Sequence, residues 1–216
     1  MILMEAAVLS KKTPAKNSNI QLRIGEWEIH HLRPAMTDGE FEDFCYKNPE
    51  LRIEQDKHGN IIIMSPVSYD SGNHESEVLI DLGMWNRKHK LGKTFSPSTM
   101  FILPDGEKRM ADAAWISNER LKKLPAAEWK KFAHVVPDFI VEVRSPSDNI
   151  KDLKEKISAI WMANGVRFAW LIDPIDEMSF IFKPGAPPVE VKGLNHLLSA
   201  EDVLPGFEFD LSILKD

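Results

Sequence analysis

The stretch PDFIVEVRSPSD, residues 137–148, combines an alternating strand pattern with charged side chains. Successive side chains of a strand point to opposite faces of a sheet. The alternation therefore puts Glu142 and Arg144 on one face, together with Asp138 and Ile140. The Ser-Pro-Ser-Asp turn that follows leads into a Lys-rich helical segment. The stretch is thus a strand that carries a carboxylate and a guanidinium up to the start of a helix.

The segments after this stretch predict a helix and two strands. Residues 148–165 have an apolar stripe at helical spacing, with Asp148 as a candidate cap and Gly165 as the stop. Lys156 and Trp161 fall on opposite flanks of that stripe. VRFAWLIDP and MSFIFKP then predict two strands. A strand, a helix and a strand in this order permit one right-handed parallel crossover in the sheet.

The segments before this stretch predict one long helix and further strands. Residues 71–90 form a helix candidate that ends at Gly92, with Glu75 on its apolar stripe and Glu77 pointing away. Either Glu75 belongs to a site, or its charge stabilises the positive end of the helix dipole. KTFSPSTMFILP and KRMADAAWIS each predict a strand, the second with Asp112 inside it. The fold class is therefore α/β (α+β), a mixed β-sheet flanked by helices.

The N-terminal part predicts a helix and a β-hairpin with structural roles. Thr37 and Glu40 have the spacing of a capping box, and Pro49 stops the helix that follows. LRIEQ and IIIMSP are then joined by the Gly-containing turn DKHGN. We expect residues 1–21 to be a flexible lead-in. Residues 22–216 should form a single domain, with a core at about residues 71–183.

Composition limits the compartment and the partners. The formal net charge of −6 argues against a generally basic nucleic-acid-binding surface, although a local cationic cleft is compatible with it. Cys45, the single cysteine, cannot form an internal disulfide or a zinc cluster, which favours a reducing compartment. No signal peptide or membrane-spanning run is present, so we expect a cytoplasmic protein without a membrane partner.

A polar, Lys-bearing insertion, NERLKKLPAAEWKKFAH, follows the strand that contains Asp112. Pro125 should break it into two short helical pieces. Surface lysines usually form a solvated face, and a nucleic-acid role is the alternative. The lysines concerned are Lys122, Lys123, Lys130 and Lys131.

Asp112 and Glu142, on two neighbouring predicted strands, could share a divalent cation. Oxygen ligands of this kind suit Mg²⁺ or Mn²⁺, which keep waters and accept substrate phosphate as a further ligand. Arg144 and Lys156 would then stabilise the negative charge of a phosphoryl transition state. The structural alternative is that the acids form salt bridges, with Asp152 and Lys156 as an i,i+4 helix pair contributing about 0.3–0.5 kcal/mol. Carboxylates on opposite faces of the sheet would exclude a shared ion.

Four ordered motifs resemble the Uma-two family, which is grouped with the restriction endonucleases in the PD-(D/E)XK nuclease superfamily. The motifs are FILPDGEKRMADAAWI, VPDFIVEVRSPSDNIKDLKEK, NGVRFAWLIDP and LSAEDVLPGF. The resemblance covers roughly residues 34–212. It implies a restriction-endonuclease-like core, a nuclease activity on DNA that requires Mg²⁺ or Mn²⁺, and a homodimer, because cleavage of two strands is simplest with paired sites.

The resemblance also implies roles for individual residues. Asp112 is similar to the Asp of the PD element, Glu142 to the acid of the (D/E)XK element, and Glu75 to an additional acid of some members. The Val143 carbonyl would be a further metal ligand.

Two positions depart from the superfamily pattern. Ala111 replaces a Pro, which is a backbone feature and not a ligand. Arg144 replaces a Lys and cannot act as a base at physiological pH, although its guanidinium can bind phosphate. Lys156 then resembles a relocated lysine.

Two functions follow from these residues. The first is a Mg²⁺-dependent nuclease that hydrolyses DNA phosphodiester bonds with water as the nucleophile. The second is a catalytically inactive nuclease-fold module that binds nucleic acid or a protein partner. Ser145 and Ser147 are expected to serve the turn and a helix cap, since no His and acid stand at a triad spacing from them. Trp85, Trp115, Trp161 and Trp170 are expected to build the core.

Overall fold

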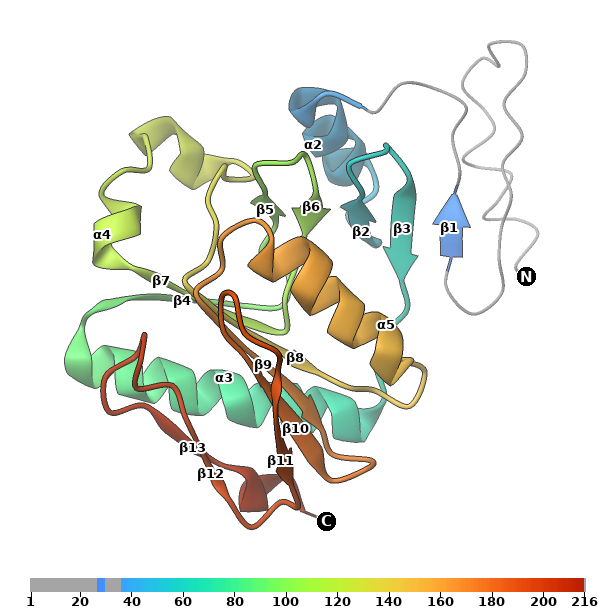
Figure 1. Ribbon diagram of the computed structural model, residues 1–216. Coiled ribbons are helices and arrows are strands. Elements are labelled where there is room, and N and C mark those ends of the chain that lie inside the picture. The colour runs from blue at the N-terminus through green and yellow to red at the C-terminus, as the bar shows by residue number, and fades with distance from the viewer. Residues whose placement is uncertain (1–26, 30–35, 216) are drawn as a thin grey trace. The chain divides into compact units, whose positions relative to one another are not determined.

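The structure is a computed structural model, which describes residues 27–29 and 36–215 (Figure 1). The predicted lead-in, residues 1–21, lies outside the described residues. Within the described part, no helix combines the length and the apolar composition needed to cross a bilayer.

The chain divides into two compact units, residues 1–64 and residues 65–216. The single domain predicted for residues 22–216 is therefore described unit by unit. Its predicted core, about residues 71–183, falls within the second unit.

The described residues of the first unit form three antiparallel strands and one helix. The strands pair in the order β1-β3-β2, and their bounds are Trp27–Ile29 (β1), Arg52–Gln55 (β2) and Ile61–Met64 (β3). Helix α2 (Asp38–Lys47) begins with a capping box. The N–H of Glu40 donates to the hydroxyl of Thr37 at 3.3 Å, and the N–H of Thr37 donates to the Glu40 carboxylate at 2.9 Å. The predicted helix and hairpin are confirmed.

A six-stranded sheet forms the centre of the second unit, in the order β11-β10-β9-β8-β7-β4. The strand bounds are Gly92–Phe95 (β4), Ala113–Ser117 (β7), Phe139–Val143 (β8), Phe168–Asp173 (β9), Met178–Phe182 (β10) and Val189–Lys192 (β11). Strands β8 and β9 pair in parallel, whereas the other neighbours are antiparallel. The chain passes from β8 to β9 through helix α5 (Ile150–Glu155). The predicted mixed sheet with one parallel connection is confirmed.

Short elements surround this sheet (Figure 1). They are β5 (Phe101–Ile102), β6 (Lys108–Arg109), α4 (Asn118–Leu121), the 3-10 helix η1 (Ala126–Lys130), β12 (Leu197–Ser199), β13 (Glu208–Asp210) and the 3-10 helix η3 (Leu211–Leu214). The insertion of residues 118–134 is thus two short helical pieces separated at Pro125, as predicted.

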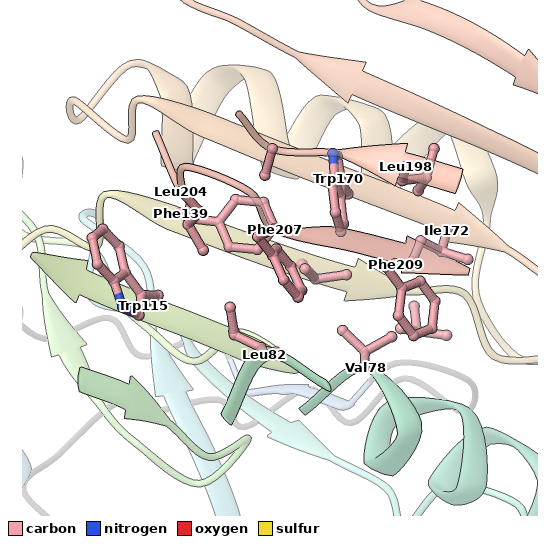
Figure 2. Close-up of a cluster of buried hydrophobic side chains, with 14 of the residues drawn as sticks. Val78, Leu82, Trp115, Phe139, Trp170, Ile172, Leu198, Leu204, Phe207 and Phe209 are labelled. Carbon is pink, nitrogen blue, oxygen red and sulfur yellow. The ribbon is translucent and has the colours of Figure 1, made fainter. Parts of the chain in front are cut away.

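Each face of the sheet packs against its own layer. Helix α3 (Tyr69–His89) and the C-terminal segment, residues 194–214, cover one face. There, Val78, Leu82 and Trp85 of α3 pack in a cluster with aromatic residues of the strands and of the C-terminal segment. Figure 2 shows Trp170 and Phe207 at the centre of this cluster. Helix α5 and the segment that continues it cover the other face. The four tryptophans predicted to build the core are all buried: Trp85, Trp115, Trp161 and Trp170.

Two predicted element ends were wrong. Helix α3 is capped by Lys90, which has a left-handed backbone conformation with φ 57°, and Gly92 is the first residue of β4. A Cβ atom on Gly92 would collide with the carbonyl oxygen of Ile116 and lie 2.6 Å from the ring of Trp115. The glycine therefore permits the close pairing of β4 with β7. Asp112 lies immediately before β7 and not inside it.

Candidate active site

Glu142 is the next-to-last residue of strand β8, and two side chains contact its buried carboxylate. The Lys156 ammonium lies 2.9 Å from Oε1 and 3.1 Å from Oε2. The indole N–H of Trp161 donates to Oε1 at 2.9 Å. Hydrogen bonds to an ionised group are about twice as strong as neutral ones, so these contacts fix the carboxylate in one orientation.

The backbone after α5 explains why Lys156 and Trp161 reach the same carboxylate. Residues Lys156–Met162 form a π-helical segment that continues α5. Residues five apart lie about 140° apart around an α-helix, but i→i+5 hydrogen bonding brings them to one face. An α-helical spacing predicts Lys156 and Trp161 on opposite flanks of the helix, whereas in the structure both contact Glu142. Such π-segments are frequent at functional sites.

Asp112 lies immediately before the first residue of the neighbouring strand β7 and contacts the backbone of β8. Its Oδ2 accepts a hydrogen bond from the N–H of Val143 at 2.7 Å. The N–H and the C=O of one strand residue point to the same side, so the Val143 carbonyl is directed toward this part of the chain as well. The Lys156 ammonium also lies 3.5 Å from the carbonyl oxygen of Met110.

The paired register of β7 and β8 stops one residue short of Asp112. Ala113 of β7 is opposite Val141 of β8, and the hydrogen bond from the Val143 N–H puts the Asp112 carboxylate beside the end of β8. Glu142 lies on the face covered by α5, as its contact with Trp161 requires. The two acids therefore come from adjacent strand ends.

Arg144 directly follows β8 and binds two carboxylates. Its guanidinium lies 2.7 Å from Asp173, the last residue of β9, and 2.6 Å from Asp176 in the turn that follows. The Arg144 N–H still donates to the carbonyl of Ile172, so the pairing with β9 continues to this residue. The hydrogen bonds to Asp173 and then to Asp176 raise the pKa of Arg144 above its ordinary value. The structure therefore gives Arg144 a structural ion-pair role, and Lys156 is the cation that contacts Glu142.

Glu75 is buried on the stripe of α3 that packs against the sheet, one turn before Val78. Val78 belongs to the cluster on the sheet face opposite to that of Trp161. Glu77 is half-buried.

The turn between β8 and α5 is built by its own polar side chains. The Ser145 N–H donates to the Asp148 carboxylate at 2.7 Å, and the Ser145 and Ser147 hydroxyls lie 3.0 Å apart. The predicted turn role of the serines is confirmed. Asp148 was the wrong choice of cap, because Asn149 accepts from the N–H of Lys151 and begins α5.

The donor set suits a hard cation with few protein ligands. Within residues 27–29 and 36–215, no group of three or more His, Cys, Asp or Glu side chains is arranged to hold a metal ion. Mg²⁺ is usually bound by only one or two carboxylates and completes its coordination with waters and substrate phosphate. Asp112 and Glu142 supply two carboxylates near the end of β8, whereas the described residues form no closed structural metal site.

Two residues that shape this site are not predicted by the sequence. The spacing of Trp161 predicts only a core residue, since nothing in a sequence shows where a helix widens. Asp173 ends a strand, and its pairing with Arg144 depends on the parallel neighbour relation of β8 and β9.

Comparison with known proteins places the chain in a family. Residues 38–212 match the model of the Uma2 family, described as "Putative restriction endonuclease". A crystal structure described as "a putative nuclease belonging to DUF820", from Anabaena variabilis ATCC 29413, has 19% sequence identity and a TM-score of 0.67. The match covers 83% of this chain and 97% of that chain, and it shows a shared fold. No curated protein matches the chain. The family model spans most of the sequence, so the chain belongs to the Uma2 family.

Proposed function

We propose that this protein is a nuclease that hydrolyses DNA phosphodiester bonds with Mg²⁺ or Mn²⁺ bound at Asp112 and Glu142. The observation that supports the proposal most directly is a pair of contacts at the end of β8: Asp112 accepts from the N–H of Val143, and Lys156 pairs with Glu142. Family membership supports the reaction class.

The chain's own residues have distinct roles in this proposal. The carboxylates of Asp112 and Glu142 and the carbonyl of Val143 would hold the ion. When bound, the ion would supply a Lewis acid that polarises the phosphoryl oxygen and lowers the pKa of water. Lys156 would donate to the scissile phosphate and stabilise the charge that develops there. Trp161 would keep Glu142 oriented.

The two remaining predicted residues are assigned differently. For Arg144 we propose a positioning role at the end of β8, because Asp173 and Asp176 already bind its guanidinium. Glu75, buried on α3, stays a prediction as an additional acid.

The test compares Mn²⁺ binding and plasmid cleavage in the wild type and in Asp112→Asn. The Asn side chain retains an oxygen that can accept from the N–H of Val143, so the fold should persist while a charge is lost. We expect calorimetry to show Mn²⁺ binding weakened at least about tenfold, and cleavage to fall by a factor of about 10² or more. Substitutions at metal sites typically reduce metal affinity or activity by about 10- to 100-fold. Asp152→Asn, on the exposed surface of α5, is the matched control and should behave as the wild type.

The same experiment identifies the alternative function. If the wild type binds no Mn²⁺ or Mg²⁺ and cleaves no more plasmid than Asp112→Asn does, the nuclease proposal is wrong. The inactive nuclease-fold module that binds nucleic acid or a protein partner would then be the better account. A homodimer remains a prediction, which the mass of the protein in solution would test.

A further inference from the structure

A basic patch lies at the end of β7 that is remote from Asp112. Three segments contribute to it: the last turn of α3, strand β4 and the insertion of residues 118–134. Its members are exposed cations: Arg87, Lys88, Lys90, Lys93, Lys122, Lys123, Lys130 and Lys131.

Specific contacts hold these three segments together. The side-chain amide of Asn118 donates to the carbonyl of Lys90 at 2.8 Å, and the backbone N–H of Asn118 donates to the carbonyl of Leu91 at 2.8 Å. The Lys93 ammonium lies 5.7 Å from the ring centroid of Trp129, whose side chain is 46% exposed. The insertion is therefore fastened to the end of α3 and to β4, which gives the patch a defined shape.

The patch is strongly positive on a chain that is acidic as a whole. Residues 87–93 and 118–134 together contain nine Lys and Arg but only two acidic residues, whereas the whole chain has a formal charge of −6. Both acids are already paired, Glu119 with Lys123 and Glu128 with His134, each at 3.0 Å. Such segregation of charge raises the local potential for a polyanion far above the value that the net charge suggests.

Structural roles account for only part of the patch. Arg87 and Lys88, in the last turn of α3, complement the negative end of the helix dipole. Lys122 follows a helix of only four residues, whose dipole is small, and Lys93 contacts the ring of Trp129 from an exposed position in β4. Lys90 has a φ of 57°, a conformation that favours glycine. A lysine at this position sacrifices stability, which is understandable if its charge has a use.

We propose that the basic patch binds the phosphate backbone of duplex DNA. The choice of DNA as the polyanion rests on the proposed nuclease function, but the patch is separate from the candidate catalytic residues. Strand β7, with Asp112 before it and Asn118 after it, spans roughly 17 Å at about 3.3 Å per residue. That length corresponds to about five base pairs at 3.4 Å each, so the patch would hold phosphates beyond the one that is cleaved.

The experiment measures binding in the absence of divalent ions, so that it does not depend on cleavage. The full chain is titrated onto a labelled duplex of about 30 base pairs, roughly three helical turns, in EDTA at several salt concentrations. Fluorescence anisotropy gives the affinity and its salt dependence. The wild type is compared with Lys122→Gln/Lys131→Gln and with the control Lys192→Gln/Lys215→Gln, which removes the same charge elsewhere.

The expected result is a loss specific to the patch. Each phosphate contact contributes about 0.9 to the slope of log K against log salt, so the patch variant should lower that slope by about 2 and weaken binding at least about tenfold at low salt. The control variant should bind as the wild type does. Equal binding by both variants, or no binding by the wild type, would overturn the proposal. Retained patch-dependent binding in a protein that cleaves nothing would uphold it while the nuclease proposal fails.

Lys90→Gly gives an independent measurement. Glycine relieves the left-handed backbone, so the midpoint of thermal unfolding should rise, while loss of the charge should lower the DNA affinity. A lysine with only a structural role could not give these opposite changes. If the affinity of Lys90→Gly equals that of the wild type, Lys90 does not belong to the DNA-binding surface and the patch as defined is wrong.

Discussion

At the scale of single residues, the hydrogen bond from Trp161 to Glu142 is the feature that most directly connects stability with the candidate site. The indole of Trp161 is fully buried and donates to a carboxylate that is 4% exposed. A hydrogen bond to a charged group contributes about 1.5–3 kcal/mol. Trp161 therefore both fills the core and orients the acid proposed to hold the ion.

Trp161→Phe should expose this double role. Phenylalanine retains most of the apolar ring but cannot donate, so the free energy of unfolding should fall through the smaller ring and through the lost hydrogen bond. Urea unfolding measures the first quantity, and calorimetry should show weaker Mn²⁺ binding, because Glu142 is no longer held from both sides.

Trp170 offers a matched control for the lost donor. It is also fully buried, but its indole N–H has no hydrogen-bond partner in the structure. Trp170→Phe thus removes the same ring atoms and no hydrogen bond. We expect Trp161→Phe to cost about 1.5–3 kcal/mol more than Trp170→Phe. Equal costs, with equal Mn²⁺ binding, would show that the indole of Trp161 acts as a core filler only.

At the scale of elements, the edge strand β4 depends on a glycine, and helix α3 contains one that it does not need. The Cβ of an alanine at Gly92 would collide with the backbone of β7. At Gly83, in the interior of α3, nothing lies within 4 Å of such a Cβ. The same substitution should therefore have opposite effects at the two positions.

We expect Gly92→Ala to destabilise the protein by about 3 kcal/mol or more, because a backbone neighbour cannot yield as a flexible side chain can. Gly83→Ala should stabilise it by about 0.5–1 kcal/mol, since alanine is the better helix former. Chemical unfolding of the two variants measures both changes. A harmless Gly92→Ala would mean that β4 does not pair closely with β7.

Elements were also the level at which the sequence was most informative. The alternation of residues 137–143 and the helical stripe after Asp148 predicted β8, α5 and β9, because burial imposes a regular spacing on apolar residues. The acids Asp112 and Glu142 were identified for the same reason, since polar residues interrupt that spacing. Ends of elements were less accessible. Lys90 in a left-handed cap and the π-helical segment depend on tertiary contacts, which a periodic pattern does not contain.

The partners of Arg144 illustrate a second limit. Alternation predicts the face on which a side chain lies, but not the groups that it contacts there. The carboxylates of Asp173 and Asp176 bind the guanidinium at the end of β8. These carboxylates lie near Arg144 because β8 and β9 pair in parallel, which brings together residues about 30 positions apart in the chain.

At the scale of the second unit as a whole, charge is distributed unevenly along helix α3. Its last turn contributes to the basic patch, whereas Asp81, near the middle of the helix, faces acidic charge from Glu77 and from Asp210 at the end of β13. Burial, then Glu77, then Asp210 raise the pKa of the Asp81 carboxyl above its ordinary value. The middle of the helix therefore carries a local electrostatic repulsion that the net charge of −6 does not reveal.

This repulsion predicts a pH-dependent gain from Asp81→Asn. Because the folded-state pKa of Asp81 is raised, the folded protein binds its proton more readily than the unfolded chain does. The carboxyl therefore destabilises the fold above that pKa, and the penalty disappears as the pH falls through it. At neutral pH, Asp81→Asn should raise the free energy of unfolding by a few tenths of a kcal/mol, as for a like-charged i,i+4 pair. The gain should vanish in acid.

Glu40 provides the comparison with opposite sign. Hydrogen bonds from the side chain and then the backbone of Thr37 lower the pKa of Glu40, so its ionised carboxylate stabilises the fold above the unfolded-state pKa and that stability is lost in acid. Glu40→Gln should therefore lose stability at neutral pH and converge with the wild type at low pH. Urea unfolding of the three proteins across the acid range measures both differences. If Asp81→Asn gains nothing at neutral pH, or gains equally at every pH, repulsion between Asp81 and its acidic neighbours does not limit the stability of the second unit.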